Sequence, residues 1–322
     1  VANGQSIGDA IKNTLFPIYH LAIAISEKNL ISLLIYLLSV LIPFAIVIYL
    51  LSKNFISIVT NKSPSKKVKL KDSDIKYSSQ KMALFKRELK HFTSNPMIML
   101  NAALGVAFTV LIAGMLLVKG VEVVDLLAVI PLQYKNMIDE YIVALLCIAV
   151  IGTSSLNIIS AGLISLEGNR LWIIKSLPIK TIDILHSKLF LHLALCIPPG
   201  LIFSIIGSIV FSLNIVDSII VVLVPVAFTV FEALFGLIVN LWKPKFDWVN
   251  ETVVVKQSAS VMITLFSTMA LVIMIGICYF SFLSEFMNVK TYVYTCLGVF
   301  ILVDLGFYYL LKTWGVRRFE EL

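Results

Sequence analysis

Residues 217–241 read DSIIVVLVPVAFTVFEALFGLIVNL, a run in which only Asp217 and Glu232 are charged. About 20 apolar residues suffice for a helix to cross the roughly 30 Å hydrocarbon core of a bilayer. Strand-like alternation over ten-residue segments, the pattern of a membrane barrel, is absent from the sequence. The chain is therefore expected to be all-α, a polytopic transmembrane helical bundle. Its seven candidate spans cover residues 30–52, 97–118, 141–165, 189–213, 217–241, 261–283 and 292–311.

The composition of the 322 residues excludes an ordinary soluble enzyme. The chain is 59% hydrophobic and 14% charged, with a mean hydropathy of +0.96, whereas soluble domains carry about 25% charged residues. The net charge of +7 would favour nucleic acid only if the basic residues gathered on one soluble face. They lie between the apolar runs instead. We therefore expect the lipid bilayer as a partner and no nucleic acid.

The four cysteines all fall inside the apolar runs, where small buried residues are more common than metal ligands or disulfides. No cofactor and no metal site are expected from them. They are Cys147, Cys196, Cys278 and Cys296.

The positions of Lys and Arg predict the orientation. Of the 26 basic residues, 21 lie in the connections 53–96, 166–188 and 242–260 and in the tail that follows residue 311. Cytoplasmic connections carry the excess of Lys and Arg. The sequence thus predicts a multi-pass protein of the cell membrane that begins outside and has a cytoplasmic C-terminus.

The distribution of polar sequence divides the seven spans into one plus six. We expect an extracellular segment at 1–29, a first transmembrane helix at 30–52 and a basic cytoplasmic linker at 53–77. An amphipathic interface helix should follow at 78–96, and a six-helix transmembrane domain at 97–322. The absence of a signal peptide and the start at Val1 lead us to expect that the chain is the latter part of a longer protein.

The predicted interface helix has apolar side chains at helical spacing and basic residues elsewhere around it. Phe85, Leu89 and Phe92 lie on one side, and Arg87 is among the basic residues. Such a helix before a span is expected to lie along the inner membrane surface, and Pro96 to turn the chain into the next crossing. A solvated helix that merely leads into the membrane is the alternative.

Two of the basic connections also carry apolar residues. Residues 166–188 place Trp172 and Leu177 beside Glu167 and Arg170, and residues 242–260 contain two further tryptophans. Connections of this kind either lie at the lipid interface or dock on a protein. The two tryptophans of the second connection could equally well be residues of the interfacial aromatic belt with no docking role.

Three runs in this order resemble the membrane subunits of bacterial ABC exporters, most closely the large Gram-positive permeases with two six-helix halves. They are KMALFKRELKHFTSNP at 81–96, ISLEGNRLW and KSLP at 164–172 and 175–178, and PKFDW and KQS at 244–248 and 256–258. The resemblance covers residues 78–322 as a second half, with 30–52 as the last helix of a first half. It implies an export-type ABC permease unit driven by ATPase subunits.

The resemblance also assigns roles to residues of the two basic connections. In that family the connection between the second and third helices of the unit seats on the cytoplasmic ABC ATPase, and the first half of the same permease or a second permease completes the membrane domain. The ATPase-docking residues implied here are Glu167, Gly168, Arg170, Trp172, Lys175, Leu177, Pro178, Asp247, Trp248, Glu251 and Lys256.

The chain should not hydrolyse ATP itself, because it contains no Gly-x-x-x-x-Gly-Lys-Ser/Thr loop to cradle the phosphates. We therefore expect a permease subunit that is not an enzyme and that couples separate ATPase subunits to translocation. A seven-helix receptor or scaffold without transport is the alternative from a different class.

Polar residues inside the spans are candidates for a translocation path. Thr153, Asn157 and Ser160 share one face of a helix over 141–165, where helix packing is the commoner use. Glu232 and Asp304 lie within spans, where a carboxylate is costly unless paired or hydrated. The alternative to a role in translocation is that these two acids form structural pairs with His192 or Tyr308. Two adjacent prolines, Pro198 and Pro199, predict a kink or break in the span 189–213.

Overall fold

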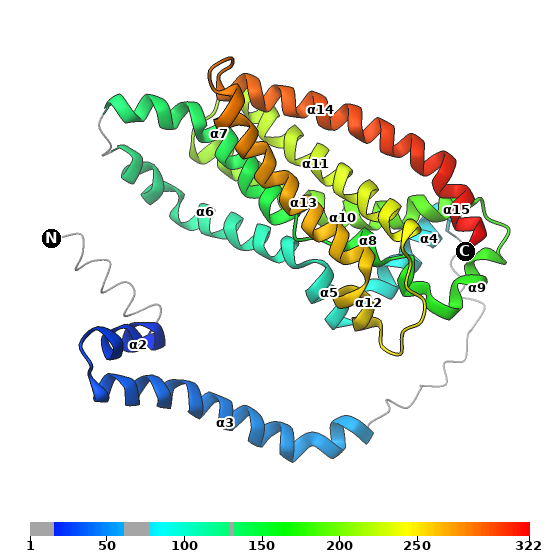
Figure 1. Cartoon of the computed structure of the whole chain (residues 1–322), viewed down its shortest axis with the longest axis horizontal. Helices are drawn as coiled ribbons and strands as arrows, with labels where there is room; N and C mark the ends of the chain where they lie inside the picture. Colours follow the sequence, from blue (N-terminus) through cyan, green and yellow to red (C-terminus); the bar gives the residue numbers. More distant parts are fainter. Residues whose placement is uncertain (1–15, 61–77, 129–131) are drawn as a thin grey trace. The chain divides into compact units, whose positions relative to one another are not determined.

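The structure, a computed structural model, describes residues 16–60, 78–128 and 132–322 (Figure 1). All elements in these ranges are helical, and seven stretches are long and apolar enough to cross a membrane. The predicted all-α polytopic bundle is therefore confirmed, and the composition of its helices indicates a multi-pass membrane protein. The seven stretches are Leu30–Asn54, Leu104–Val124, Glu140–Lys175, Thr181–Val210, Ile215–Trp242, Glu251–Leu283 and Val289–Glu321.

The chain divides into two compact units, Val1–Lys76 and Tyr77–Leu322. In the first, the short helix α2 (Phe16–Ser26) packs against α3 (Leu30–Thr60). The side-chain oxygen of Asn29 caps α3, accepting from the backbone N–H groups of Ile31 and Ser32 at 2.9 and 3.2 Å.

Three of the predicted segments, 1–29, 30–52 and 53–77, fall in the first unit, apart from Tyr77. Helix α3 continues to Thr60, so the first eight residues of the linker expected from residue 53 are helical. The rest of that linker, 61–77, and residues 1–15 of the predicted extracellular segment lie outside the described residues.

The second unit contains six long helices joined in an up-and-down order. They are α6 (Leu104–Ala128), α7 (Leu132–Ser154), α10 (Thr181–Val210), α11 (Ile215–Trp242), α13 (Ala259–Cys278) and α14 (Val289–Leu310). Helix α13 is extended by η3 (Tyr279–Leu283), and α14 by η4 (Leu311–Gly315) and α15 (Val316–Glu321). Shorter elements gather at one end: α4 (Gln80–Thr93), α5 (Pro96–Ala102), α8 (Ile159–Gly162), η2 (Ser165–Arg170), α9 (Leu171–Lys175) and α12 (Glu251–Gln257). This end is called the loop end below.

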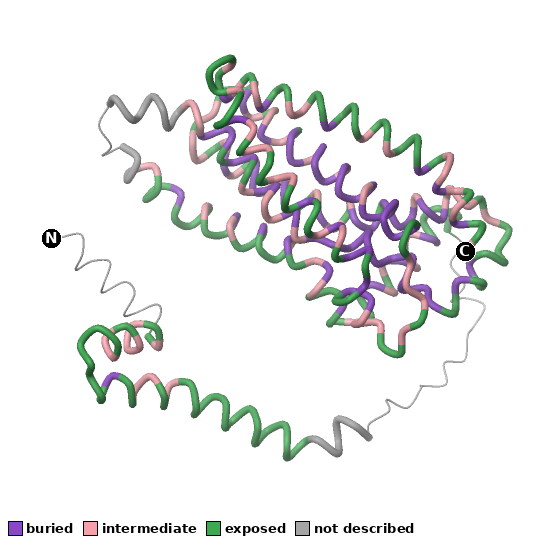
Figure 2. The backbone as a smooth tube through the Cα atoms, viewed as in Figure 1, coloured by how far each residue is buried: buried purple, intermediate pink, exposed green. Residues whose placement is uncertain are grey.

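Helix α11 is the centre of the unit. The most apolar parts of the stretches that contain α7 and α11 are 67% and 61% buried, against 11% for the stretch that contains α14, and α11 contacts α7, α8, α10, α13 and α14. Figure 2 shows the buried residues on α11 and around the loop end, and exposed residues along α14 and α6. The outward faces are mostly apolar, as expected for a surface that meets lipid.

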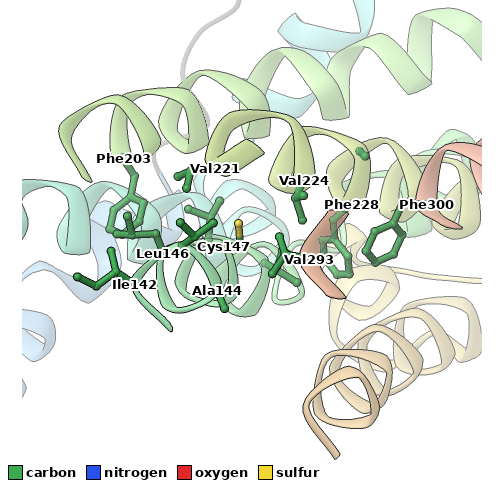
Figure 3. Packing of buried hydrophobic residues seen from close by; sticks show 14 of the residues in the cluster. Ile142, Ala144, Leu146, Cys147, Phe203, Val221, Val224, Phe228, Val293 and Phe300 are labelled. Atoms are coloured by element: carbon green, nitrogen blue, oxygen red, sulfur yellow. The ribbon is translucent and has the colours of Figure 1, made fainter. Parts of the chain in front are cut away.

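The half of the bundle away from the loop end has a largely apolar core, although Ser204 and Asp217 are also buried in that half. Side chains from α7, α10, α11 and α14 interdigitate there, with Phe228 edge-on to Phe300 at a ring distance of 5.6 Å (Figure 3). Cys147 lies inside this core as a small buried residue. Polar and charged buried residues concentrate instead in the other half.

Three helix boundaries differ from the prediction. The span expected at 97–118 is divided into α5 and α6 at Ala103, whose φ of −112° and ψ of 31° are not helical. The span expected at 141–165 ends as a regular helix at Ser154. The break expected at Pro198 and Pro199 is absent, since α10 is helical throughout; packed neighbouring helices let membrane helices tolerate the missing N–H groups.

Candidate functional site

The most unusual feature of the second unit is a buried loop, residues 155–168, that follows α7. Thirteen of these positions are buried, only Leu156 being half-buried, although much of the segment has no regular helix to satisfy its backbone. Its polar groups are bonded from outside: Ile158 N–H donates to Ala102 O at 2.9 Å, and Asn157 Oδ1 accepts from Val106 N–H at 3.0 Å. An irregular segment buried within a bundle indicates a specific role for its position.

The break corrects the predicted polar face of Thr153, Asn157 and Ser160, because the helix that would align them ends before Asn157. Thr153 Oγ1 lies 2.8 Å from Thr109 Oγ1, which ties α7 to α6. Gly105 allows the approach of α6, since a Cβ there would lie 2.1 Å from Thr153 O. Thr153 and Asn157 thus have helix-packing roles.

Four charged residues hold one side of the buried loop and are called the ion-pair cluster: Arg87 and Glu88 of α4, Glu167 of η2 and Lys188 of α10. Lys188 Nζ donates to Glu167 Oε1 at 2.7 Å, to Glu88 Oε2 at 3.0 Å and to Leu163 O at 3.1 Å. Arg87 donates to both oxygens of Glu167, at 3.0 and 2.6 Å, and to Glu88 Oε1 at 2.6 Å.

The ion-pair cluster is complete in charge and in hydrogen bonds. Two acids face two bases, all three N–H donors of Lys188 are used, and every carboxylate oxygen has a donor. Lys188 is fully buried, and Glu88 and Glu167 are 1% and 3% exposed. Hydrogen bonding to Glu167 raises the pKa of the Arg87 guanidinium above its usual value. Because the loss of one member would strand a buried charge, the cluster fixes α4, α10 and the loop together.

Asn240 of α11 holds the other side of the buried loop. Its Oδ1 accepts from the backbone N–H groups of Ile164 and Ser165 at 2.8 and 3.2 Å. Its Nδ2 donates to Ser165 Oγ at 2.7 Å and to Ser260 Oγ at 3.0 Å. Ser260 Oγ in turn donates to Ala161 O at 2.9 Å. A single buried amide thus ties α11 and α13 to the loop.

Trp248 joins the second basic connection to the same loop. Its indole Nε1 donates to Ser165 O at 2.8 Å, and its ring packs on Gly168, where a Cβ would lie 2.7 Å from Trp248 Cζ2. Gly168 has φ +51°, a backbone conformation that favours glycine. The conformation and the contact both require glycine at this position.

The predicted ATPase-docking residues divide into an inner and an outer set. Glu167 and Gly168 are buried and Trp248 is half-buried, so these three position the loop and do not form an open surface. Glu251 is also engaged, accepting from Asn95 Nδ2 at 3.0 Å with His91 Nε2 at 3.6 Å. Lys175 is exposed but donates to Glu320 O at 2.8 Å.

The outer set remains free at the surface of the loop end. Its charged members form no ion pair with another described residue, and Trp172 is 67% exposed. Ile173, which the resemblance did not include, is 45% exposed beside it. The outer set consists of Arg170, Trp172, Leu177, Pro178, Asp247 and Lys256, all of them exposed.

The predicted interface helix corresponds to α4, but its most buried face differs from the expected one. Leu84, Glu88 and Phe92, spaced by four residues, pack against the bundle, while Phe85 and Leu89 are half-buried on one flank. Glu88 is a site residue that the sequence reasoning missed. Its spacing from Leu84 and Phe92 was the available signal. Lys188 and Asn240 were missed as well. Lys188 was counted only among the basic residues of a connection, and the sequence around Asn240 has no pattern that marks it as a site residue.

The two intramembrane acids have different surroundings. Glu232 of α11 is fully buried, with Oε2 at 3.6 Å from Nε2 of His192 on α10. Asp304 of α14 is half-buried, and its Oδ1 finds no hydrogen-bond partner among residues whose placement is described. Tyr308 pairs with His186 at 3.2 Å instead of with an acid. Of the predicted pairings, only that of Glu232 with His192 brings two side chains together.

The described residues contain no group of three or more His, Cys, Asp or Glu side chains placed to hold a metal ion. Comparisons of the chain with protein-family models, with curated proteins and with solved structures find no match.

Proposed function

We propose that the chain is a membrane-spanning permease subunit of an ATP-driven ABC exporter, with separate ATPase subunits docking on the outer set at the loop end. The observation that carries this proposal is an exposed, aromatic and charged surface next to a buried loop that is held by side-chain hydrogen bonds. Arg170, Trp172 and Leu177 are exposed, while the residues just before them are held by the ion-pair cluster and Asn240.

The composition of the outer set suits a protein interface. Buried aromatic and Arg anchors supply most of the binding energy at such interfaces, and charges at the rim set orientation and association rate. Trp172 and Ile173 supply apolar area, and Arg170, Asp247 and Lys256 supply charge of both signs. The charged surface of a soluble partner is a better match for this mixture than hydrocarbon is.

The buried loop also offers a route by which movement of a docked partner would reach the membrane helices. A displacement of η2 would act on α10 through Lys188, on α11 through Asn240 and on α4 through Arg87. Such rigid connections transmit motion because packed elements shift as units rather than deform continuously. ATP-driven closure of a pair of ATPases would thus move several helices together. The first half of the same permease, or a second permease, would complete the membrane domain.

The test is retention of the ATPase after purification from the native membrane. The double variant Arg170→Glu with Trp172→Ala is expected to lose the ATPase while inserting normally, since it removes an anchor and reverses a rim charge. The matched control, Lys119→Glu with Phe282→Ala, makes the same kinds of change at exposed positions away from the loop end and should retain it. Equal retention by both variants would contradict the docking assignment.

A seven-helix receptor or scaffold without transport predicts a different result. In that case no ATPase co-purifies with the unmodified protein, and no ATPase turnover responds to added compounds. An ATPase whose turnover rises with a candidate substrate supports the exporter.

A further inference from the structure

Three buried polar side chains meet where α8, α10 and α11 pack together: Ser160, His192 and Glu232, each 0% exposed. The carboxyl Oε2 lies 3.6 Å from His192 Nε2. Both carboxyl oxygens, His192 Nε2 and Ser160 Oγ lack hydrogen-bond partners within the part of the chain that the structure describes. Gly236 makes room for this arrangement, because a Cβ there would lie 2.4 Å from Ser160 Oγ. The cluster is therefore compact and buried, and its polar atoms are incompletely hydrogen-bonded by the described residues.

The surroundings favour a protonated carboxyl group on Glu232. An ionised carboxylate away from water costs several kcal/mol unless a cation or several donors stabilise it. Lys188 lies one helical turn from His192, but its three N–H groups are all directed to the ion-pair cluster and Leu163 O. Among the described residues no free cation lies beside Glu232, so the neutral, protonated form of its carboxyl group is favoured.

The tautomer of His192 follows from its bond to the buried loop. The backbone N–H of Ser160 lies 3.3 Å from His192 Nδ1, and because an N–H can only donate, Nδ1 is the acceptor. The neutral ring then carries its hydrogen on Nε2, the nitrogen that faces Glu232. As long as the Ser160 bond stands, neither ring nitrogen can take a further proton.

We propose that Ser160, His192 and Glu232 form a proton-binding site in the membrane region, in which uptake of a proton by His192 requires release of the buried loop. In the closed state the Glu232 carboxyl holds one proton and Nδ1 accepts from Ser160. When the Ser160 N–H withdraws, a proton from solvent can bond to Nδ1 and form an imidazolium beside Glu232. Acid pH should therefore favour the released loop.

The other titratable groups on the packed helices leave this assignment intact. The ion-pair cluster has a net charge of zero and pairs internally. Cys196 lies one turn beyond His192 on α10, and Asp304 belongs to α14, which packs on α11. His186, on the same helix as His192, is bonded to Tyr308 instead and so provides a control.

The first test is hydrogen exchange of residues 159–168 in the purified chain in lipid nanodiscs. After correction for intrinsic chemistry, exchange should speed up on acidification, by up to about tenfold per pH unit for one coupled proton. His192→Asn keeps an acceptor oxygen near the position of Nδ1 but cannot titrate, so the pH response should disappear. His186→Asn should respond like the unmodified chain. A response that survives in His192→Asn would overturn the proposal.

The second test is the infrared carbonyl stretch of protonated carboxylic acids at neutral pH. Glu232→Gln should remove one such band. The control Asp304→Asn should leave that band in place, because any band that it removes belongs to Asp304. Persistence of the full signal in Glu232→Gln would mean that Glu232 is ionised and would overturn the proposal. If His192→Asn does not fold, nitrogen NMR of labelled histidine in the unmodified chain decides the tautomer, and a hydrogen on Nδ1 contradicts it. Neither test depends on an ATPase.

Discussion

Lys188 is the residue on which the order of the loop end depends most directly. It is fully buried and bonds to Glu88 of α4 and to both Leu163 O and Glu167 of the buried loop. Lys188→Met would leave Glu88 and Glu167 with Arg87 as their only cation, and breaking a buried pair in this way costs about 3–5 kcal/mol. We expect a large fall in thermal stability in detergent. Lys180→Met, at an exposed position of the same helix end, should change stability little; equal losses in the two variants would contradict the assignment.

At the scale of single residues, the sequence predicted which side chains matter better than it predicted their roles. Glu167 and Gly168 were expected at a docking surface, and both lie inside the loop end. Their partners, Lys188 and Trp248, are 21 and 80 positions away in sequence, and no local pattern reports such pairings. Glu232 and His192 form a buried pair, as one interpretation expected, because an acid within an apolar helix has few alternatives.

Asn95 is the junction of three elements, and its two functions can be separated by substitution. Its Oδ1 caps α5 by accepting from Met97 and Ile98, and its Nδ2 donates to Glu251 of α12. Asn95→Ala should lose both and cost about 1 kcal/mol for the cap alone. Asn95→Asp keeps the cap oxygen but sets a second carboxylate beside Glu251.

Hydrogen exchange resolved by segment checks this prediction. In Asn95→Asp we expect faster exchange in residues 251–257 and little change in 96–102, whereas Asn95→Ala should affect both. Asn288 supplies a control, because it caps α14 at the opposite end by accepting from Thr291 N–H at 2.9 Å. Asn288→Ala should leave hydrogen exchange in both segments unchanged. Faster exchange of residues 251–257 in Asn288→Ala would mean that the effect of the Asn95 substitutions is not local.

At the scale of elements, apolar length predicted the long helices, and what it could not predict was where one of them stops. The composition of residues 141–165 suits a continuous span, yet the helix ends at Ser154 because tertiary bonds compete successfully for the next backbone groups. Ile158 N–H goes to Ala102 O, and Asn240 takes the N–H groups of Ile164 and Ser165. These partners are distant in sequence, so hydropathy carries no signal for the break.

For the molecule as a whole, the one-plus-six pattern of apolar runs and the asymmetry of Lys and Arg lead to the last prediction, the orientation. The loop end carries most of the basic connections, so it should face the cytoplasm. Single cysteines in a background without the four native ones test this in intact cells with a membrane-impermeant maleimide. Positions 119 and 285, away from the loop end, and position 27, before α3, should be labelled from outside. Positions 170 and 256, both exposed at the loop end, should be labelled only after permeabilisation. The reverse pattern would place the outer set outside the cell, where no cytoplasmic ATPase could reach it. If positions 27 and 119 are labelled from opposite sides, the chain between them does not cross the membrane twice, which contradicts the prediction of seven crossings.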